Sequence, residues 1–283
     1  MKLLNLGCGQ NYHKDWINID FVSSSDYVVP HNLLEGIPLN DESVSVVYHS
    51  HVLEHFSKMD GLNFMKECFR VLKPNGIIRI AVPDLETIAK EYLRNLELAS
   101  LGDIGGKYNY EWIKLELLDQ MVRNESGGEM KEYLFQSSVP NEKYIYSRIG
   151  LEGKTIRQAF LKNQNLVSTQ INITAPKTSL LKRFMNRIKK YISNKLRKSK
   201  NEILTVEQRR ALRIGKFRLN GEIHQWMYDR YSLTELLEKV GFKEIILCSA
   251  FESQIDNWEK YQLDVVDGEI RKPDSLFIEA KKS

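Results

Sequence analysis

Two glycines and an acidic residue near the start of the chain have the types and spacing of a nucleoside site. The apolar run 3–6 leads into Gly7, Cys8 and Gly9, and Asp20 follows eleven residues after Gly9, at the end of the segment 16–20. Glycine lets the backbone approach a ligand closely, where a Cβ would collide. A carboxylate after the next strand can accept two hydrogen bonds from the vicinal hydroxyls of a ribose. The pattern predicts a site for an adenosyl ligand.

Four further side chains could take part in acid–base chemistry or bind a substrate. His51 and His55 follow the strand-like segment 44–49, Asp84 follows the segment 77–82, and His224 lies where the chain returns to the sheet. Each also has a purely structural alternative: His55 as a cap, Asp84 as the N-cap of a helix over 85–99, and His224 as part of hinge packing.

A metal site would require imidazoles that converge, and the spacing of these histidines does not predict it. His49, His51 and His55 belong to a strand end and a turn, where successive side chains point in different directions. We found no carboxylate or cysteine cluster to complete a ligand set, so we expect no metal.

Strand-like and helical segments alternate in the order that builds a parallel sheet. Strands are expected at 2–6, 17–21, 27–30, 44–49 and 77–82, with an amphipathic helix over 58–72 that begins with a capping box at Ser57. A second capping box at Ser232 opens a short helix that Gly241 closes, and strands are expected at 244–250 and 275–280. The fold class is therefore α/β, with a doubly wound, mostly parallel sheet.

The sheet pattern stops after the fifth strand and resumes only near residue 223. We expect residues 1–83 and 223–283 to form one core and residues 84–222 to form a helical insertion that covers the cleft and recognises the substrate. Helices are predicted over 84–99, 108–123 and 154–163.

Charge is distributed unevenly along the chain. The whole chain has a net charge of +4, but residues 182–218 alone carry fourteen Lys or Arg against two acids. Apolar residues recur at helical spacing through 180–196, so this stretch could lie on an anionic membrane, pack as an ordinary amphipathic helix, or contact RNA. Three scattered cysteines fit a reduced, cytoplasmic protein, and Met1 leads directly into the first strand, leaving no room for a signal peptide.

Several sequence segments, in the same order along the chain, resemble those of the class I S-adenosylmethionine-dependent methyltransferases. They are the glycine motif 4–9, Asp20, the fourth strand with its lead-in over 38–48, the turn 51–55, the helix-to-strand phrase 69–76, and 82–85. The sequence of residues 224–229, together with 231–233, resembles a segment of predicted methyltransferases from surface-polysaccharide gene clusters. Asn11 replaces a third glycine, which argues against a nicotinamide-binding Rossmann domain. Asn5 and Asn32 stand where acids are common, although an amide oxygen can still accept a hydrogen bond from adenine.

The resemblance implies a seven-stranded sheet with an antiparallel last strand, and S-adenosyl-L-methionine as the cofactor. It implies cofactor contacts from eight positions, which are Asn5, Gly7, Cys8, Gly9, Asp20, Asn32, Leu33 and His49, with His51, His55, Asp84 and His224 as catalytic candidates. We expect O-methylation of a sugar or lipid-linked glycan in polysaccharide biosynthesis, in the cytoplasm or peripherally at the inner membrane face through residues 180–200. An RNA methyltransferase and a non-catalytic scaffold of the same fold are the alternatives.

Overall fold

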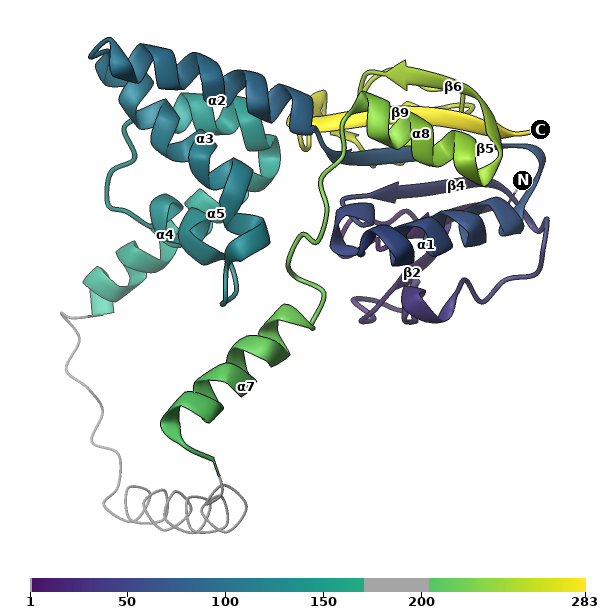
Figure 1. Cartoon of the computed structure of the whole chain (residues 1–283), viewed down its shortest axis with the longest axis horizontal. Helices are drawn as coiled ribbons and strands as arrows, with labels where there is room; N and C mark the ends of the chain where they lie inside the picture. The colour runs from purple at the N-terminus through teal and green to yellow at the C-terminus, as the bar shows by residue number, and fades with distance from the viewer. Residues whose placement is uncertain (1, 171–203) are drawn as a thin grey trace.

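The computed structural model describes residues 2–170 and 204–283. A sheet flanked by helices forms one part of the molecule, and a group of helices from the middle of the sequence lies beside the edge at which several strands end (Figure 1). The chain runs from the sheet into this helical part after β5 and comes back to the sheet through α7 and α8.

The main sheet has seven strands in the order β3-β2-β1-β4-β5-β9-β6. They are β1 (Leu3–Leu6), β2 (Ile17–Asp20), β3 (Val28–Pro30), β4 (Val44–Ser50), β5 (Leu72–Pro83), β6 (Phe242–Cys248) and β9 (Ser275–Lys282). The first five are parallel to one another, whereas β9 is antiparallel to both β5 and β6. The α/β class and the antiparallel last strand expected from the sequence are therefore confirmed.

β1 lies in the middle of the sheet and is buried on both faces. All four of its residues are buried, and Leu4 pairs with Ile17 on one side and with Val47 on the other. A parallel strand covered on both faces is expected to be mainly apolar, and three of its four residues are leucines, the fourth being the buried Asn5. The strand order reverses between β1 and β4, and at such a point the connecting loops diverge and leave a crevice.

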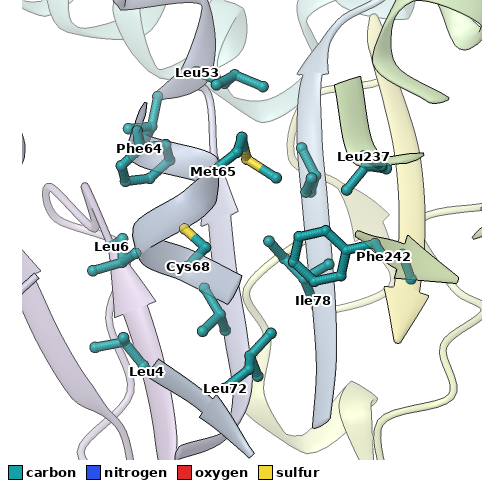
Figure 2. Packing of buried hydrophobic residues seen from close by; sticks show 14 of the residues in the cluster. Leu4, Leu6, Leu53, Phe64, Met65, Cys68, Leu72, Ile78, Leu237 and Phe242 are labelled. Atoms are coloured by element: carbon teal, nitrogen blue, oxygen red, sulfur yellow. The ribbon is translucent and has the colours of Figure 1, made fainter. Parts of the chain in front are cut away.

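Helix α1 (Lys58–Val71) covers one face of the sheet. Its N-cap is Ser57, which accepts a hydrogen bond from the Asp60 backbone N–H, as the sequence predicts. Figure 2 shows Phe64, Met65 and Cys68 of this helix facing the leucines of β1 and Ile78 of β5. Residues 73–76, at the end of the segment 69–76, are part of β5, which has an irregularity here and a φ of +61° at Asn75.

Helix α8 (Arg230–Val240) begins three residues before the position expected from the sequence. Its capping box consists of Asp229 and Ser232 rather than Ser232 and Glu235, and it ends at Gly241, whose φ of 115° suits a left-handed C-cap. The side chains of Leu233 and Leu237 join the same core as α1.

The helical part contains α2 (Leu85–Ser100), α3 (Ile104–Val122), α4 (Gly128–Leu134), α5 (Glu142–Gln170) and α7 (Val206–Arg218). The sequence did not predict α4, and α5 begins twelve residues earlier than expected, with a break in helical geometry at Gly150. The predicted basic helix over 180–200 lies outside the described residues.

The remaining elements are short and lie in the loops. They are η1 (Leu33–Glu35), η2 (Leu53–His55), η3 (Trp258–Tyr261), β7 (Val265–Val266) and β8 (Glu269–Ile270). Over the ranges that the structure describes, there is no helix with both the length and the apolar character needed to span a bilayer.

Candidate active site

A cavity of about 520 Å³ opens where β1 and β4 end, at the crevice created by the reversal of strand order. The glycine turn and the end of β4 form one wall. Helix α5 and the loop before β9 form the other. Its lining residues include Gly7, Gly9, Tyr48, His51, Glu152, Thr155, Arg271 and Lys272. The cavity therefore lies between the sheet and the helical insertion.

The two glycines of the turn have different structural reasons to be glycine. Gly7 has a φ of +61°, and a Cβ added to it would lie 2.3 Å from a methyl group of Val52. Gly9 has a φ of +54°, but a Cβ there would meet nothing within 4 Å because this residue faces the cavity. Gly7 thus permits close packing with the turn after β4, whereas Gly9 leaves backbone exposed to a ligand.

Asp20 ends β2 and points toward the glycine turn. Its Oδ2 accepts a hydrogen bond from the Gly9 N–H at 2.8 Å, and its Oδ1 accepts one from the Val22 N–H at 3.2 Å. Each carboxylate oxygen can accept a further bond, so two vicinal hydroxyls could still be held. The carboxylate and the glycine turn lie together as an adenosyl site requires.

Two other residues of the first motif hold the turn in shape. Asn5 is buried, and its Nδ2 donates to the Asn11 carbonyl at 3.0 Å and to the Asn18 Oδ1 at 3.2 Å. Burial, with a smaller effect from Asp20, raises the pKa of the Cys8 thiol to about 12. Both residues line the cavity, but Cys8 stays protonated near neutral pH and is a poor nucleophile.

Asn32 and Leu33 lie after β3 and do not belong to the cavity lining as described. The Asn32 Oδ1 accepts a hydrogen bond from the Leu34 N–H at 3.1 Å and caps η1, so this oxygen already has a donor. If Asn32 binds adenine as expected, the adenine amino group must therefore be a second donor to the same oxygen.

His49 does not lie at the cavity, in contrast to the expectation from the sequence. Side chains alternate along β4, so Tyr48 and Ser50 face the cavity while His49 points toward α1. Its ring packs edge-on against Phe64, with 5.1 Å between centroids, and is fully buried. Burial lowers the pKa of His49 to about 3, which keeps the ring neutral in an apolar core.

His51 does line the cavity, with a φ of +56° immediately after β4. Its Nε2 lies 2.8 Å from the Ser275 Oγ, and its Nδ1 lies 3.3 Å from a carboxylate oxygen of Glu54. Burial, followed by the nearby Lys272 and Arg271, lowers its pKa well below the ordinary value. Among the four catalytic candidates, His51 is the one that the described cavity lining includes.

Asp84 is the N-cap of α2 and is not found among the residues described around the cavity. Its Oδ1 accepts a hydrogen bond from the Glu86 N–H at 3.0 Å, and its Oδ2 accepts one from the Thr87 hydroxyl. The structural alternative therefore accounts for both carboxylate oxygens.

His55 and His224 lie together behind His51, with 4.9 Å between ring centroids. They adjoin the buried carboxylate of Glu54, a residue that the sequence analysis did not select. The aromatic residues after His224 serve hinge packing: Tyr228 joins the main core, and Lys58 lies 3.8 Å above the Trp226 ring.

The sequence analysis also missed the far wall of the cavity, which comes from α5 and the loop before β9. Glu152 and Thr155 come from the insertion, whereas Arg271 and Lys272 come from the end of the chain. Lys272 pairs with Glu152 at 2.8 Å, and this ion pair connects the loop before β9 to α5. No local motif marks these residues, because they come together only when the insertion folds onto the core.

Comparison with known proteins agrees with this arrangement. Residues 4–80 match the family described as "Methyltransferase domain". A protein of Mycolicibacterium smegmatis, named "Probable S-adenosylmethionine-dependent methyltransferase", is 31% identical over 104 residues, which are 31% of this chain and 40% of that protein. A similarly named protein of Mycobacterium tuberculosis is 31% identical over 105 residues, 31% of this chain and 37% of that one.

The chain thus spans about two fifths of the length of these curated relatives. A solved structure, described as a "SAM dependent methyltransferase from Archaeoglobus fulgidus", has 12% identity and a TM-score of 0.37, covering 99% of this chain and 86% of that one.

Residues 4–80 are similar to the methyltransferase domain family, and the sheet order is the one implied by the resemblance to class I S-adenosylmethionine-dependent methyltransferases. The cofactor of such domains is S-adenosylmethionine, and the residues present fit it. Gly9 leaves open space where a side chain would block a ligand, and Asp20 lies beside it with acceptor capacity to spare.

Proposed function

We propose that this chain is an active S-adenosylmethionine-dependent methyltransferase that methylates a hydroxyl group of a sugar or glycan. The observation that carries the activity is the hydrogen bond of 2.8 Å from the Gly9 N–H to Asp20, because Gly9 lines the cavity of about 520 Å³ and Asp20, which is outside the described lining, adjoins it through this bond. The acceptor is the finer part of the proposal and rests on the polar character of the cavity's far wall.

The cofactor would supply a methyl group bonded to a positively charged sulfur. Asp20 would hold the ribose, and the exposed backbone at Gly9 would lie against the nucleoside. Tyr48 on the sheet side and Leu151 and Ile156 on α5 restrict the space in which acceptor and cofactor meet. Alignment of the reacting atoms and exclusion of water supply most of the catalysis in a direct displacement.

Hydrogen-bonding side chains of the far wall support a hydroxyl-rich acceptor. Glu152, Thr155 and Lys272 all line the cavity and offer both donors and acceptors. They come from α5 and the last loop, outside the segment that matches the methyltransferase family, where differences in acceptor would be expected.

We also propose that the acceptor is lipid-linked and is reached at the inner membrane face. The support is the sequence of residues 180–200, in which basic residues alternate with apolar ones at helical spacing. Flotation of the full chain with vesicles tests this. Binding to vesicles with anionic lipid, but not to neutral vesicles, would support it, and failure to float at low salt would refute it.

Titration calorimetry with S-adenosylhomocysteine tests the cofactor site, and transfer of a labelled methyl group tests the acceptor. We expect stoichiometric binding, and transfer to glycans with free hydroxyls rather than to RNA. Binding without transfer to any glycan, together with salt-sensitive methylation of RNA, would favour the RNA enzyme. Absence of binding would leave only a scaffold of this fold.

A further inference from the structure

We propose that Glu54, His55 and His224 bind a divalent transition-metal ion, best represented by Zn²⁺, beside the cavity. One ligand atom from each of the three residues lies within 4.8 Å of the others. This site rests on and extends the proposed function, because Glu54 lies 3.3 Å from His51, which lines the cavity where the acceptor is expected. It replaces our expectation from the sequence that no metal is bound.

Two segments far apart in the sequence are held together at this point by the backbone. The Glu54 carbonyl accepts hydrogen bonds from the N–H groups of Gln225 at 2.7 Å and Trp226 at 3.2 Å. The Gln225 side chain donates to the His55 carbonyl at 2.8 Å, and the His224 N–H donates to the Gln120 carbonyl at 3.0 Å. The three side chains are therefore placed by a rigid framework rather than by a mobile loop.

Glu54 is the strongest reason to infer a ligand. Its side chain is 0% exposed, and neither carboxylate oxygen has a hydrogen-bond partner among the described residues. An unpartnered buried carboxylate is costly and rare, and it needs a proton or a cation. A bound cation would compensate for the missing donors.

The two imidazoles present the neutral form that metals require. The His55 Nδ1 lies 3.1 Å from the Ile223 carbonyl, which can only accept, so this nitrogen carries the hydrogen and the Nε2 lone pair is free. The Nδ1 of His224 is buried and lacks a partner within the described part of the chain, and its Nε2 lies 4.0 Å from Glu54. Ligating histidines commonly donate their second nitrogen to a carbonyl in this way.

Nearby positive charges do not occupy the site. Lys272 pairs with Glu152 at 2.8 Å, and Arg123 lies 3.8 Å from Glu222. Ligands around a tetrahedral zinc ion lie roughly 3.3 Å apart, so binding requires side-chain shifts of about 1 Å.

Two histidines and one carboxylate are a donor set for zinc or iron that leaves coordination positions open. His51 lies 3.3 Å from Glu54 and lines the cavity, so an open position could be reached from there. A metal-bound hydroxyl loses its proton more readily. In the transfer, the acceptor O–H proton passes to water, an oxygen–carbon bond forms, and the carbon–sulfur bond breaks with its electron pair remaining on sulfur.

The test uses full-length protein freed of metal by a chelator and titrated with Zn²⁺ alone, in the absence of cofactor. We expect one equivalent to bind with a Kd below ~1 μM, and Glu54→Gln to weaken binding at least ~100-fold. His13→Gln, a histidine outside the cluster, serves as the matched control and should bind as the wild type does. Absence of stoichiometric binding, or equal affinity in Glu54→Gln and wild type, would overturn the proposal.

Glu54→Gln keeps the size and shape of the side chain and replaces a carboxylate oxygen with an amide nitrogen, so we expect the variant to fold. Circular dichroism checks this. Zn²⁺ should raise the melting temperature of the wild type and leave that of Glu54→Gln unchanged. An equal rise in both would contradict the assignment.

Calorimetry with S-adenosylhomocysteine on the metal-free protein separates this proposal from the proposed function. Zn²⁺ binding without cofactor binding would support the metal site and refute the proposed methyltransferase activity. Cofactor binding without Zn²⁺ binding would support the cofactor site and refute the metal site. If both bind, chelation should lower methyl transfer at least ~10-fold while leaving cofactor affinity unchanged; transfer unaffected by chelation would remove the metal from the reaction.

Discussion

The hydroxyl of Tyr48 donates a hydrogen bond of 2.6 Å to the buried carboxylate of Asp264. Tyr48 is on β4 and lines the cavity, whereas Asp264 comes from the loop between η3 and β7. Arg79 of β5 donates to the same carboxylate at 2.8 Å and to Glu279 of β9 at 2.7 Å. A cavity wall is thus held by an ion-pair network on the opposite side of the sheet from α1.

The first prediction concerns this network. Arg79→Met keeps the apolar stem but leaves Asp264 and Glu279 buried without their cation, so we expect the free energy of unfolding to fall by about 3–5 kcal/mol. Urea denaturation at neutral pH measures this. The exposed pair of Arg94 and Glu91 offers a control, because Arg94→Met should cost less than about 1 kcal/mol. Equal losses in the two variants would contradict the assigned role.

The second prediction separates the two glycines of the turn. Gly7→Ala should destabilise the fold by about 1–3 kcal/mol, because the new methyl group would overlap Val52 and the φ is positive. Gly9→Ala meets no neighbour, so its cost should be limited to about 1 kcal/mol of backbone strain, whereas affinity for S-adenosylhomocysteine should fall. Thermal unfolding and calorimetry on both variants check this. Equal melting temperatures would refute the packing argument for Gly7.

Asp20 is the subject of the third prediction. Asp20→Ala removes the acceptors for the ribose hydroxyls and for the Gly9 N–H, so S-adenosylhomocysteine should bind at least ~10-fold more weakly, or ~1.4 kcal/mol. Asp26→Ala, an exposed acid in the loop after β2, serves as the control. Unchanged calorimetry would exclude Asp20 from the site.

The fourth prediction concerns pH and α8. The Ser232 N–H, which Asp229 caps at 2.8 Å, lowers the pKa of this carboxyl. A lowered folded-state pKa means that the contribution is present above the ordinary pKa of an aspartate and is lost as the pH falls through the folded value. Asp229→Ala should therefore cost about 1 kcal/mol at pH 7 and less near pH 3. Urea denaturation at both pH values measures the difference, and a cost that grows on acidification would contradict it.

The local sequence was sufficient for the framework of the sheet. Mainly apolar segments predicted β1, β4 and β5, and Ser57 predicted the start of α1. The glycine turn and Asp20 were expected to share one ligand site, and the structure places the Gly9 N–H 2.8 Å from the Asp20 carboxylate. These features depend on neighbouring residues, whose periodicity and backbone preferences are encoded locally.

What the tertiary structure decided was which polar side chains meet. The sequence suggested His49 for the cofactor site, but the alternation of β4 turns it into the core and leaves Tyr48 and Ser50 at the cavity. Glu54 looked like one acid in a turn until His224, 170 residues later, came to lie 4.0 Å from its carboxylate. Burial and the loss of water around that carboxylate arise only when the returning chain covers the turn, so no local pattern could reveal them.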